Sequence, residues 1–594
     1  MQKQKTAEAS HSALNYCRRA TKTVTIGGIP LGSLHPLRIQ TMANVSTNDV
    51  EQGVAQTLRV YAVGCDYMRF TAQGVREATA LGEIYKTLRE RGCSIPLVAD
   101  IHFNPQAAYE ALKHVEKVRI NPGNFADHKG DRAQYPSEEA WYEAGAQRVS
   151  EVFGAFVEEA KRLGRVLRLG INHGSLSERM LHRWGNTPEG MVESCWEYLS
   201  VAQAHQFDDI VISMKSSNVQ VMTQAVRLLA ARLDAHGWNF PLHLGVTEAG
   251  EGEDGRIKSA VGIGSLLLDG IGDTLRVSLS EAPEAELPVA QRLVYHVTQR
   301  AEAPLLSYAG ALEYTPAMLP RTESRCVADC YGGTTLPKVL VCGEIRGGEK
   351  PLIAGDALLP YGVEWEHLSV EAAEGVHFRC FDAERLTPAD IVKVKSDACT
   401  VLLLHATGAN AVGAWRRAVA LLTEENCTAP LLLYRSFEEE AWEDIQLFAS
   451  ADIGLLLLEE VASGIVLSSP CYRAEELYSV GLGILQATRL RFSHTEFISC
   501  PGCGRTLFDL EGTIARVKKA TAHLPNLKIG IMGCIVNGPG EMADADYGYV
   551  GGAPGKIDLY KGQECQMRGI PEAEAVEALI ELIRLHGDWI EPVE

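Results

Sequence analysis

The chain has 594 residues and a formal net charge of −20. Hydrophobic residues make up 46% of it and charged residues 22%, proportions typical of a soluble globular protein. The length is too great for one ordinary core, so we expect about two to four domains. The acidic balance argues against non-specific nucleic-acid binding, and no apolar run reaches the length of a membrane span.

Two further features indicate the cellular compartment. The first 28 residues contain no apolar core that could act as a secretory signal. The 15 cysteines in so long a chain are typical of reduced thiols and metal ligands rather than of a disulfide framework. We therefore expect a cytoplasmic protein.

The first 300 residues alternate short apolar runs with longer amphipathic ones. The runs expected to be strands cover residues 37–42, 67–72, 95–103, 117–123, 166–174, 209–217, 242–250 and 273–280. Each is followed by a helical pattern, and this alternation predicts a parallel sheet covered by helices. Eight such units favour an α/β fold of the closed (β/α)₈ type, a TIM barrel, over residues 20–300. An open doubly wound sheet is the alternative.

Polar side chains follow the predicted strands at their C-terminal ends, where the active sites of such barrels lie. They are Arg69, Asp100, His102, Arg119, Asn121, Arg168, Asn172, His173, Ser213, Lys215, Glu248, Arg276 and Ser278. Four arginines and a lysine around one opening predict a polyanionic ligand, because guanidinium groups suit phosphate oxygens. Asp100 and Glu248 would be available for proton transfer. We therefore expect the barrel to act on a small phosphorylated substrate.

The middle of the chain predicts a second α/β domain. Residues from about 300 to 335 are rich in Pro, Gly and Tyr and are interpreted as a linker. The strands expected after it are "KVLVCGE", "VHFRCF", "TVLLLHA", "PLLLYRS", "IGLLLLEE" and "GIVLSSP". Their ends carry no set of acids and bases comparable with that of the barrel, which favours a structural spacer. We assign this domain and its linker to residues 301–490, and a C-terminal α+β domain to residues 491–594.

Three cysteines near the end of the chain, Cys500, Cys503 and Cys534, are candidate metal ligands. Zinc ribbons usually have two CxxC pairs, and only one is present here. A thioredoxin-like dithiol would not need the third cysteine. Three thiolates would leave one iron of a cubane cluster open to a weaker ligand or a substrate. On spacing alone, an iron–sulfur cluster, zinc and no metal all remain open, and the fourth ligand is Cys565 or an oxygen donor such as Glu541.

Six motifs give the chain a more specific resemblance. In chain order they are "RINPGN", "GINHGSL", "SMKSSN", "GVTEAG", "ISCPGCGRT" and "GCIVNGPGE". Together they resemble those of the hydroxymethylbutenyl diphosphate synthases, the family that acts in the penultimate step of the methylerythritol phosphate route to isoprenoids. The chain resembles the longer form of this family, which has an inserted middle domain.

The resemblance implies an activity. It is the reductive ring opening and dehydroxylation of 2-C-methyl-D-erythritol 2,4-cyclodiphosphate to (E)-4-hydroxy-3-methylbut-2-enyl diphosphate. The resemblance implies that a [4Fe-4S] cluster delivers the two electrons, that flavodoxin or ferredoxin is the electron donor, and that the protein is a homodimer. The alternatives from other classes are a zinc-stabilised phosphosugar aldolase or isomerase and a non-catalytic scaffold.

The resemblance also implies roles for individual residues. Cys500, Cys503 and Cys534 would bind the cluster, with Glu541 as its exchangeable fourth ligand. The substrate-binding set would be Arg69, Arg119, Arg168, Asn172, Lys215, Arg276 and Ser278. Asp100 and Glu248 match the acidic positions of the family, and we expect Glu248 to be the proton donor.

Overall fold

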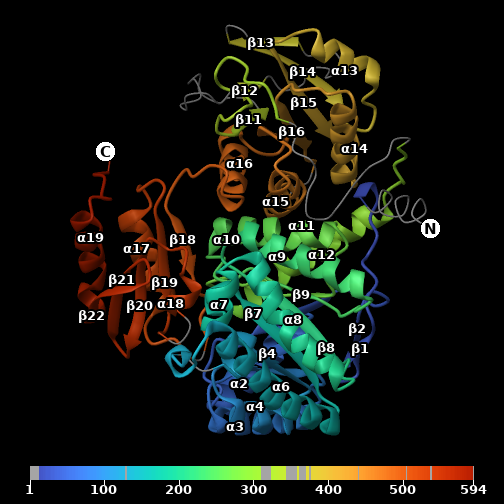
Figure 1. The fold of residues 1–594 in the computed structure, drawn as a ribbon. Coiled ribbons are helices and arrows are strands. Elements are labelled where there is room, and N and C mark those ends of the chain that lie inside the picture. The colour runs from blue at the N-terminus through green and yellow to red at the C-terminus, as the bar shows by residue number, and fades with distance from the viewer. Residues whose placement is uncertain are drawn as a thin grey trace. The chain divides into compact units, whose positions relative to one another are not determined.

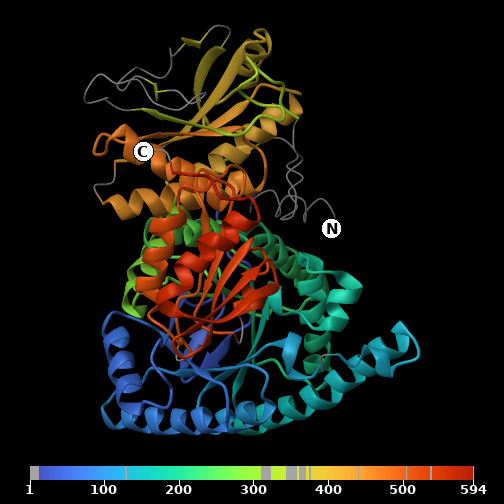
Figure 2. The same cartoon turned by 90° about the vertical axis from the view of Figure 1, so that its left-hand side faces the viewer.

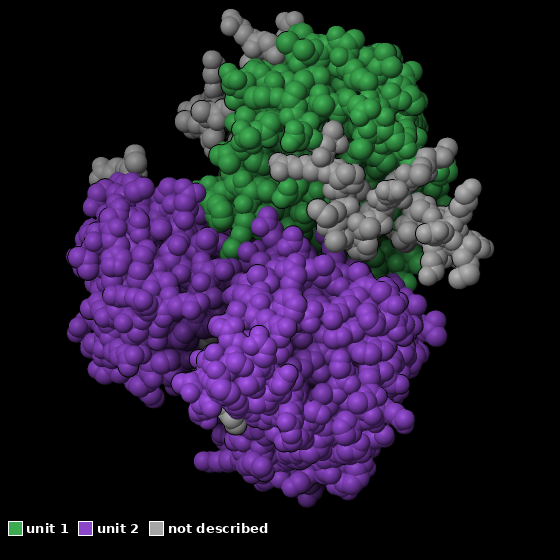
Figure 3. Space-filling view, viewed as in Figure 1, with its two compact units in different colours: residues 1–18, 256–270, 292–493 green, residues 19–255, 271–291, 494–594 purple. Residues whose placement is uncertain are grey.

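The computed structural model describes residues 13–127, 130–308, 323–342, 358–359, 369–373, 376–438, 441–503, 505–535 and 538–592. The chain divides into two compact units, coloured separately in Figure 3. We call residues 19–255, 271–291 and 494–594 the barrel unit, and residues 1–18, 256–270 and 292–493 the middle unit. Residues 256–270 and 292–300, which we assigned to the barrel domain, therefore group with the middle unit.

Eight parallel strands form the sheet of the barrel unit (Figure 1). They are β3 (Arg38–Met42), β4 (Tyr67–Ala72), β5 (Leu97–Ile101), β6 (Lys117–Ile120), β7 (Val166–Asn172), β8 (Ile210–Lys215), β9 (His243–Leu244) and β10 (Thr274–Leu275). Their order is β8-β7-β6-β5-β4-β3-β10-β9, and a parallel bridge between Ile212 and Leu242 joins the first strand to the last. The predicted barrel is confirmed.

Amphipathic helices alternate with these strands. They include α2 (Val50–Ala62), α3 (Val75–Glu90), α4 (Pro105–Leu112), α6 (Glu138–Leu163), α8 (Pro188–Ala204), α9 (Val219–His236) and α12 (Pro283–Glu302). Helix α3 buries Ala78, Leu81, Ile84 and Leu88, a spacing of three or four residues that keeps one apolar face toward the core.

A short hairpin closes the N-terminal end of the barrel. Strands β1 (Val24–Ile26) and β2 (Ile29–Leu31) are antiparallel. Their apolar side chains share a buried cluster with Tyr67 and Val166, each the first residue of its barrel strand. The hairpin therefore covers this end of the barrel with apolar side chains, and the candidate site lies at the opposite end, where the strands finish.

Strands β9 and β10 are shorter than the predicted runs 242–250 and 273–280. Gly245 follows β9 directly, and a Cβ atom there would lie 2.5 Å from Lys215 Nζ. Glu248 has a left-handed backbone with φ of +49°, which a strand cannot contain. The chain therefore leaves the ladder early and forms a loop at the barrel opening.

The middle unit contains a seven-stranded sheet of order β12-β11-β17-β16-β15-β14-β13. Its strands are β11 (Lys338–Cys342), β12 (Leu358–Leu359), β13 (Ser369–Ala373), β14 (Val376–Asp382), β15 (Thr400–Ala406), β16 (Leu431–Ser436) and β17 (Gly464–Ser468). All pairs are parallel except β13 with β14. The helices are α13 (Pro388–Lys395), α14 (Ala411–Glu424), α15 (Trp442–Leu458) and α16 (Ala474–Ala487). An α/β domain was predicted here.

One predicted strand of this unit is wrong. The run "IGLLLLEE" belongs to the C-terminal half of α15, a helix whose residues from Asp444 to Leu457 are all buried. This helix packs against the π-helical turn Ala260–Gly264 of the same unit, where glycines on both sides, Gly264 and Gly454, allow close approach. A helix buried on all sides has no polar face, so its apolar run looks like a buried strand.

The C-terminal end of the predicted linker packs against the sheet of the middle unit. Val327 and Tyr331 form a short antiparallel bridge and are buried, with exposed fractions of 2% and 5%. They pack into the same apolar cluster as Phe378 and Tyr434 of the sheet. Residues 309–322 of the proposed linker lie outside the described residues.

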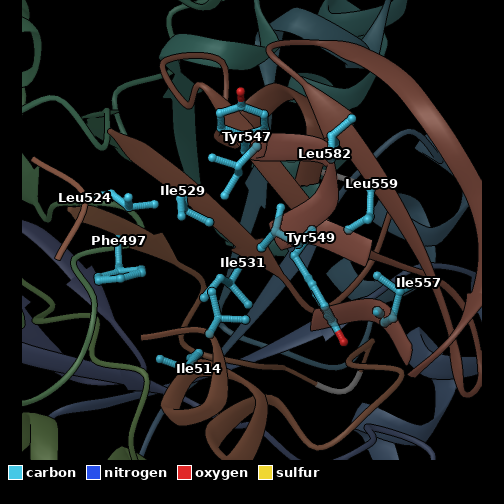
Figure 4. Close-up of a cluster of buried hydrophobic side chains, with 14 of the residues drawn as sticks. Phe497, Ile514, Leu524, Ile529, Ile531, Tyr547, Tyr549, Ile557, Leu559 and Leu582 are labelled. Atoms are coloured by element: carbon cyan, nitrogen blue, oxygen red, sulfur yellow. The ribbon is translucent and has the colours of Figure 1, made fainter. Parts of the chain in front are cut away.

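The C-terminal part of the barrel unit has its own sheet and core. Strands β18 (Glu496–Ser499), β19 (Lys528–Met532) and β20 (Tyr547–Ala553) are parallel, and β21 (Lys556–Lys561) and β22 (Glu564–Pro571) continue the sheet in antiparallel fashion. Helices α17 (Leu510–Thr521) and α19 (Ala575–Leu585), red in Figure 2, contribute side chains to the apolar cluster drawn in Figure 4. This mixed sheet places the cysteine-bearing loops after β18 and β19.

In the part of the chain that the structure describes, no helix combines the length and the apolar character needed to cross a membrane.

Candidate functional site

One cavity in the barrel unit brings the predicted site residues together. Its lining includes Arg69, Asp100, Arg119, Arg168, Asn172, Lys215, Glu248, Arg276 and Ser278 from the barrel. Cys500, Cys503, Cys534 and Glu541 complete it from the C-terminal sheet. Residues more than 400 positions apart in the chain therefore face the same space.

The cavity has an excess of buried positive charge. The five cationic side chains from the barrel are Arg69, Arg119, Arg168, Lys215 and Arg276, with exposed fractions of 8%, 3%, 1%, 5% and 3%. Arg276 forms a 2.7 Å ion pair with Glu286, and Arg119 forms one of 2.9 Å with Asp100. Two nitrogens of Arg168, Nε and Nη2, have no hydrogen-bond partner among the described residues. Buried cations without matching anions favour an anionic ligand.

The excess of buried positive charge affects the pKa values of Lys215 and Arg69. Burial, followed by the charges of Arg69 and Arg168, lowers the pKa of Lys215 well below its usual value. Burial also lowers the pKa of Arg69 to about 10, although Asp100 opposes the shift. A bound polyanion would relieve the repulsion between these groups.

Asp100 forms ion pairs with Arg119 and Arg69. Burial alone would raise its pKa, but Arg69 and Arg119 outweigh burial and hold the pKa well below the usual value. Arg119 also donates from Nη2 to the carbonyl oxygen of Gly170 at 2.7 Å, where a Cβ atom would come within 2.1 Å of Arg119 Nε. The carboxylate therefore stays ionised and orients the arginines, an arrangement that does not suit a proton donor.

Glu248 has the opposite environment. Its side chain is buried, and Oε2 has no hydrogen-bond partner among the described residues. Burial first, and then the neighbouring Glu541 carboxyl group, raises the pKa of Glu248 well above its usual value. Its left-handed backbone costs of order 1–3 kcal/mol, which the surrounding contacts must offset. These surroundings favour the protonated form of Glu248, the form that could donate a proton to a ligand.

Glu541 ends the short helix α18 (Gly538–Glu541) and contacts the barrel directly. Asn172 Nδ2 donates to Glu541 Oε1 at 2.9 Å. The backbones also meet closely, because a Cβ atom on Gly174 would lie 1.5 Å from the carbonyl oxygen of Gly540. A second contact joins the Oγ atoms of Ser280 and Ser499 at 2.9 Å. The barrel and the C-terminal sheet of one chain thus enclose the cavity.

The cysteine sulfurs accept hydrogen bonds from nearby N–H groups. The backbone N–H of Gly533 donates to Cys500 Sγ at 3.3 Å, and Arg505 Nε donates to Cys503 Sγ at the same distance. Burial raises the pKa of the Cys500 thiol to about 12. N–H donors to sulfur are a usual feature around iron–sulfur clusters.

The donor set fits a cluster of several irons. Among the residues that the structure describes, no three His, Cys, Asp or Glu side chains converge closely enough to bind a single metal ion. A cubane cluster needs no such convergence, because each of its irons takes one protein ligand. Three cysteines and Glu541 around one cavity are consistent with that requirement.

Some residues named from the sequence lie elsewhere. Asn121 donates to Ser175 Oγ, and Ser213 accepts from Arg168, so both support neighbouring groups rather than line the cavity. Cys565 is on β22 and does not line the cavity, whereas Glu541 does.

Sequence reasoning missed Arg505, which lines the cavity from the C-terminal side. The signal was present, because this arginine stands two residues after Cys503. A cation so close to a candidate ligand could have been singled out.

In the middle unit, sequence reasoning overlooked a polar chain at the strand ends. His405 Nε2 lies 2.7 Å from Ser436 Oγ, which lies 2.8 Å from Ser468 Oγ. The three residues are at or next to the ends of β15, β16 and β17. These three side chains include no carboxylate or guanidinium group, so they do not reproduce the ionic set of the barrel.

Comparison with known proteins identifies relatives along almost the whole chain. Residues 21–291 match the family model for the GcpE TIM-barrel domain, and residues 496–585 match that for the GcpE protein C-terminal domain. The 4-hydroxy-3-methylbut-2-en-1-yl diphosphate synthase (flavodoxin) of Porphyromonas gingivalis is 52% identical over 97% of this chain and 99% of its own. The enzyme of the same name from Parabacteroides distasonis is 48% identical, with coverage of 97% and 99%. The chloroplastic, ferredoxin-named synthase of Oryza sativa subsp. japonica is 38% identical, with coverage of 97% and 88%.

Proposed function

The chain belongs to the GcpE family, and from this premise we propose that it converts 2-C-methyl-D-erythritol 2,4-cyclodiphosphate to (E)-4-hydroxy-3-methylbut-2-enyl diphosphate. The observation that carries the proposal is the shared cavity, in which buried cations from the barrel face three cysteines from the C-terminal sheet. In this reaction two electrons and one proton enter, the ring C–O bond to phosphate breaks, and a hydroxyl group leaves as water.

The barrel cations would bind the diphosphate. Arg119 is held by Asp100 and Gly170, so its position is fixed before the substrate arrives. The unpaired nitrogens of Arg168 would gain charge-assisted hydrogen bonds from phosphate oxygens. Asn172, Lys215, Arg276 and Ser278 would complete the set. Because these groups are fixed and buried, they would also stabilise the charge that develops on the diphosphate as the ring opens.

Cys500, Cys503, Cys534 and Glu541 would hold a [4Fe-4S] cluster. When bound, such a cluster supplies electrons one at a time. The hydrogen bond from Asn172 to Glu541 gives this carboxylate a partner on the barrel. The chain could therefore keep Glu541 in place whether or not it is a ligand, which suits an exchangeable fourth position.

Glu248 would donate the proton. It is buried, it lines the cavity, and one of its oxygens has no partner among the described residues. Asp100 lines the same cavity, but its ion pairs with the arginines favour a role in orienting them. Because the barrel and the C-terminal sheet both line the cavity, they would limit the access of water to the proton donor and the diphosphate site.

Electrons would come from flavodoxin or ferredoxin, the donors in the names of the relatives. The middle domain, proposed at residues 301–490 between the barrel domain (20–300) and the C-terminal domain (491–594), would act as a spacer. A homodimer is also proposed.

The test is turnover by anaerobically prepared protein with a chemical reductant, assayed beside iron and sulfide content. We expect about four irons per chain and formation of the linear diphosphate. Stoichiometric zinc with no iron, as a zinc-stabilised aldolase or isomerase would contain, would contradict the proposal. So would a fully loaded cluster without conversion of the cyclic diphosphate.

A further inference from the structure

Arg505 is a cation of the cavity to which the proposed reaction assigns no role. It lies between β18 and α17, on the same loop as Cys500 and Cys503. It also lines a second cavity, formed with barrel residues 72–73 and 102–104. Asp100, His102 and Arg505 line both cavities, so these three side chains form the partition between them.

The guanidinium group is directed toward a ligand sulfur. Arg505 Nε donates to Cys503 Sγ at 3.3 Å. A tight turn fixes this geometry: Cys503 N donates to Thr506 Oγ1 at 3.1 Å, and Thr506 N donates to the carbonyl oxygen of Cys503 at 3.0 Å. The turn therefore brings Arg505 beside Cys503 within the same loop.

Arg505 differs from the barrel cations in its partner. Arg119 and Arg276 each form an ion pair with a buried carboxylate. For Arg505, among the described residues, the hydrogen-bond acceptor is a thiol sulfur, and no carboxylate forms an ion pair with it. Its charge is thus compensated mainly by whatever charge the cysteine site carries.

We propose that Arg505 is a positioning residue that raises the reduction potential of the cluster bound through Cys503; this inference rests on the proposed function. Reduction by one electron adds negative charge to the cluster and its thiolates. A fixed cation and N–H donor at a ligand sulfur stabilises the reduced state more than the oxidised one. Arg505 would make the cluster easier for the electron donor to reduce.

Three variants separate charge from hydrogen bonding. Arg505→Gln keeps an N–H donor and removes the charge, Arg505→Lys keeps the charge without the planar donor, and Arg505→Met removes both. The matched control is Arg516→Met on α17, because Arg516 is half exposed and pairs with Glu572 away from the cavity. Each anaerobic protein is analysed for iron, and the cluster is then titrated redox-potentiometrically without substrate, with the reduced state followed by electron paramagnetic resonance.

We expect Arg505→Met to lower the equilibrium constant for one-electron reduction of the cluster at least tenfold. This corresponds to a reduction potential lower by about 59 mV. Arg505→Lys and Arg505→Gln should shift it less, and Arg516→Met should match the parent. A parental potential in fully loaded Arg505→Met overturns the inference, and a raised KM in that variant would then make Arg505 a substrate ligand. Failure of both Lys and Gln variants to hold iron also overturns it, because the side chain would then be required for the loop itself. Absence of iron from the parent would instead refute the proposed function.

Discussion

Replacement of Glu248 by Gln tests the proposed proton donor most directly. The two side chains have the same shape, and the Gln amide can still hydrogen-bond to Glu541. The site is buried and one Glu248 oxygen is unpartnered, so the substitution breaks no hydrogen bond of that oxygen to the described residues. Because burial raises the pKa of Glu248, its ionisable group disfavours the fold at neutral pH, so we expect Glu248→Gln to be at least as stable as the parent and to keep parental iron content.

The expected rate loss is much larger than a hydrogen bond could explain. Loss of a positioned proton donor typically costs a factor of about 10²–10⁴, or roughly 3–5 kcal/mol of barrier. Loss of one neutral hydrogen bond is worth about 1 kcal/mol and would slow turnover only about fivefold. The size of the effect therefore separates proton transfer from a structural contact.

The assay is turnover with a chemical reductant at saturating substrate, beside iron content and visible spectrum. The matched control is Glu83→Gln, an exposed position on barrel helix α3, which should behave as the parent. Asp100→Asn is the contrasting variant. It breaks a buried ion pair with Arg119, so it should lower stability by about 3–5 kcal/mol and raise KM. If Glu248→Gln retains turnover within tenfold of the parent, Glu248 is not the proton donor and Asp100 becomes the candidate.

Three further predictions concern the ligand set, the closed cavity and the middle unit. Cys534→Ser should lose iron and activity together, whereas Cys565→Ser should keep both if Glu541 is the fourth ligand; iron loss from Cys565→Ser would change that assignment. Gly174→Ala should retain iron but lose turnover, because its Cβ would lie 1.5 Å from the Gly540 carbonyl oxygen. The control is Gly92→Ala, whose Cβ meets no atom within 4 Å. Equal activity in the two variants would contradict the close contact. Burial lowers the pKa of His405 in the folded state to about 4 from the ordinary value of 6.5. Below pH 6.5 the unfolded chain binds a proton that the folded chain does not, so the stability present above pH 6.5 is lost as pH falls toward 4. Denaturant unfolding at pH 7 and pH 5 should show a loss of about 1–2 kcal/mol that His405→Gln reduces, with parental turnover at pH 7; an unchanged pH dependence would refute the assignment.

The sequence alone determined the barrel and most of the cavity. Parallel strands of a barrel end on one side, so the strand pattern was sufficient to assign residues such as Arg119 and Lys215 to one opening. The cysteine spacing identified Cys500, Cys503 and Cys534 as candidate ligands in the same way. These conclusions needed only the local period of the strands and the chemistry of the side chains.

Other features depended on contacts between distant parts of the chain. The helix α15 was mistaken for a strand at "IGLLLLEE" because burial on all sides removes the polar face that identifies a helix. The sequence also did not show that the pKa of Asp100 is lowered and that of Glu248 is raised, since both are strand-end acids in the sequence. Asp100 lies among arginines, whereas Glu248 lies beside Glu541, a residue almost 300 positions later. Only the tertiary structure decides which charges become neighbours in a buried site, and those neighbours decide whether a carboxyl group keeps its proton.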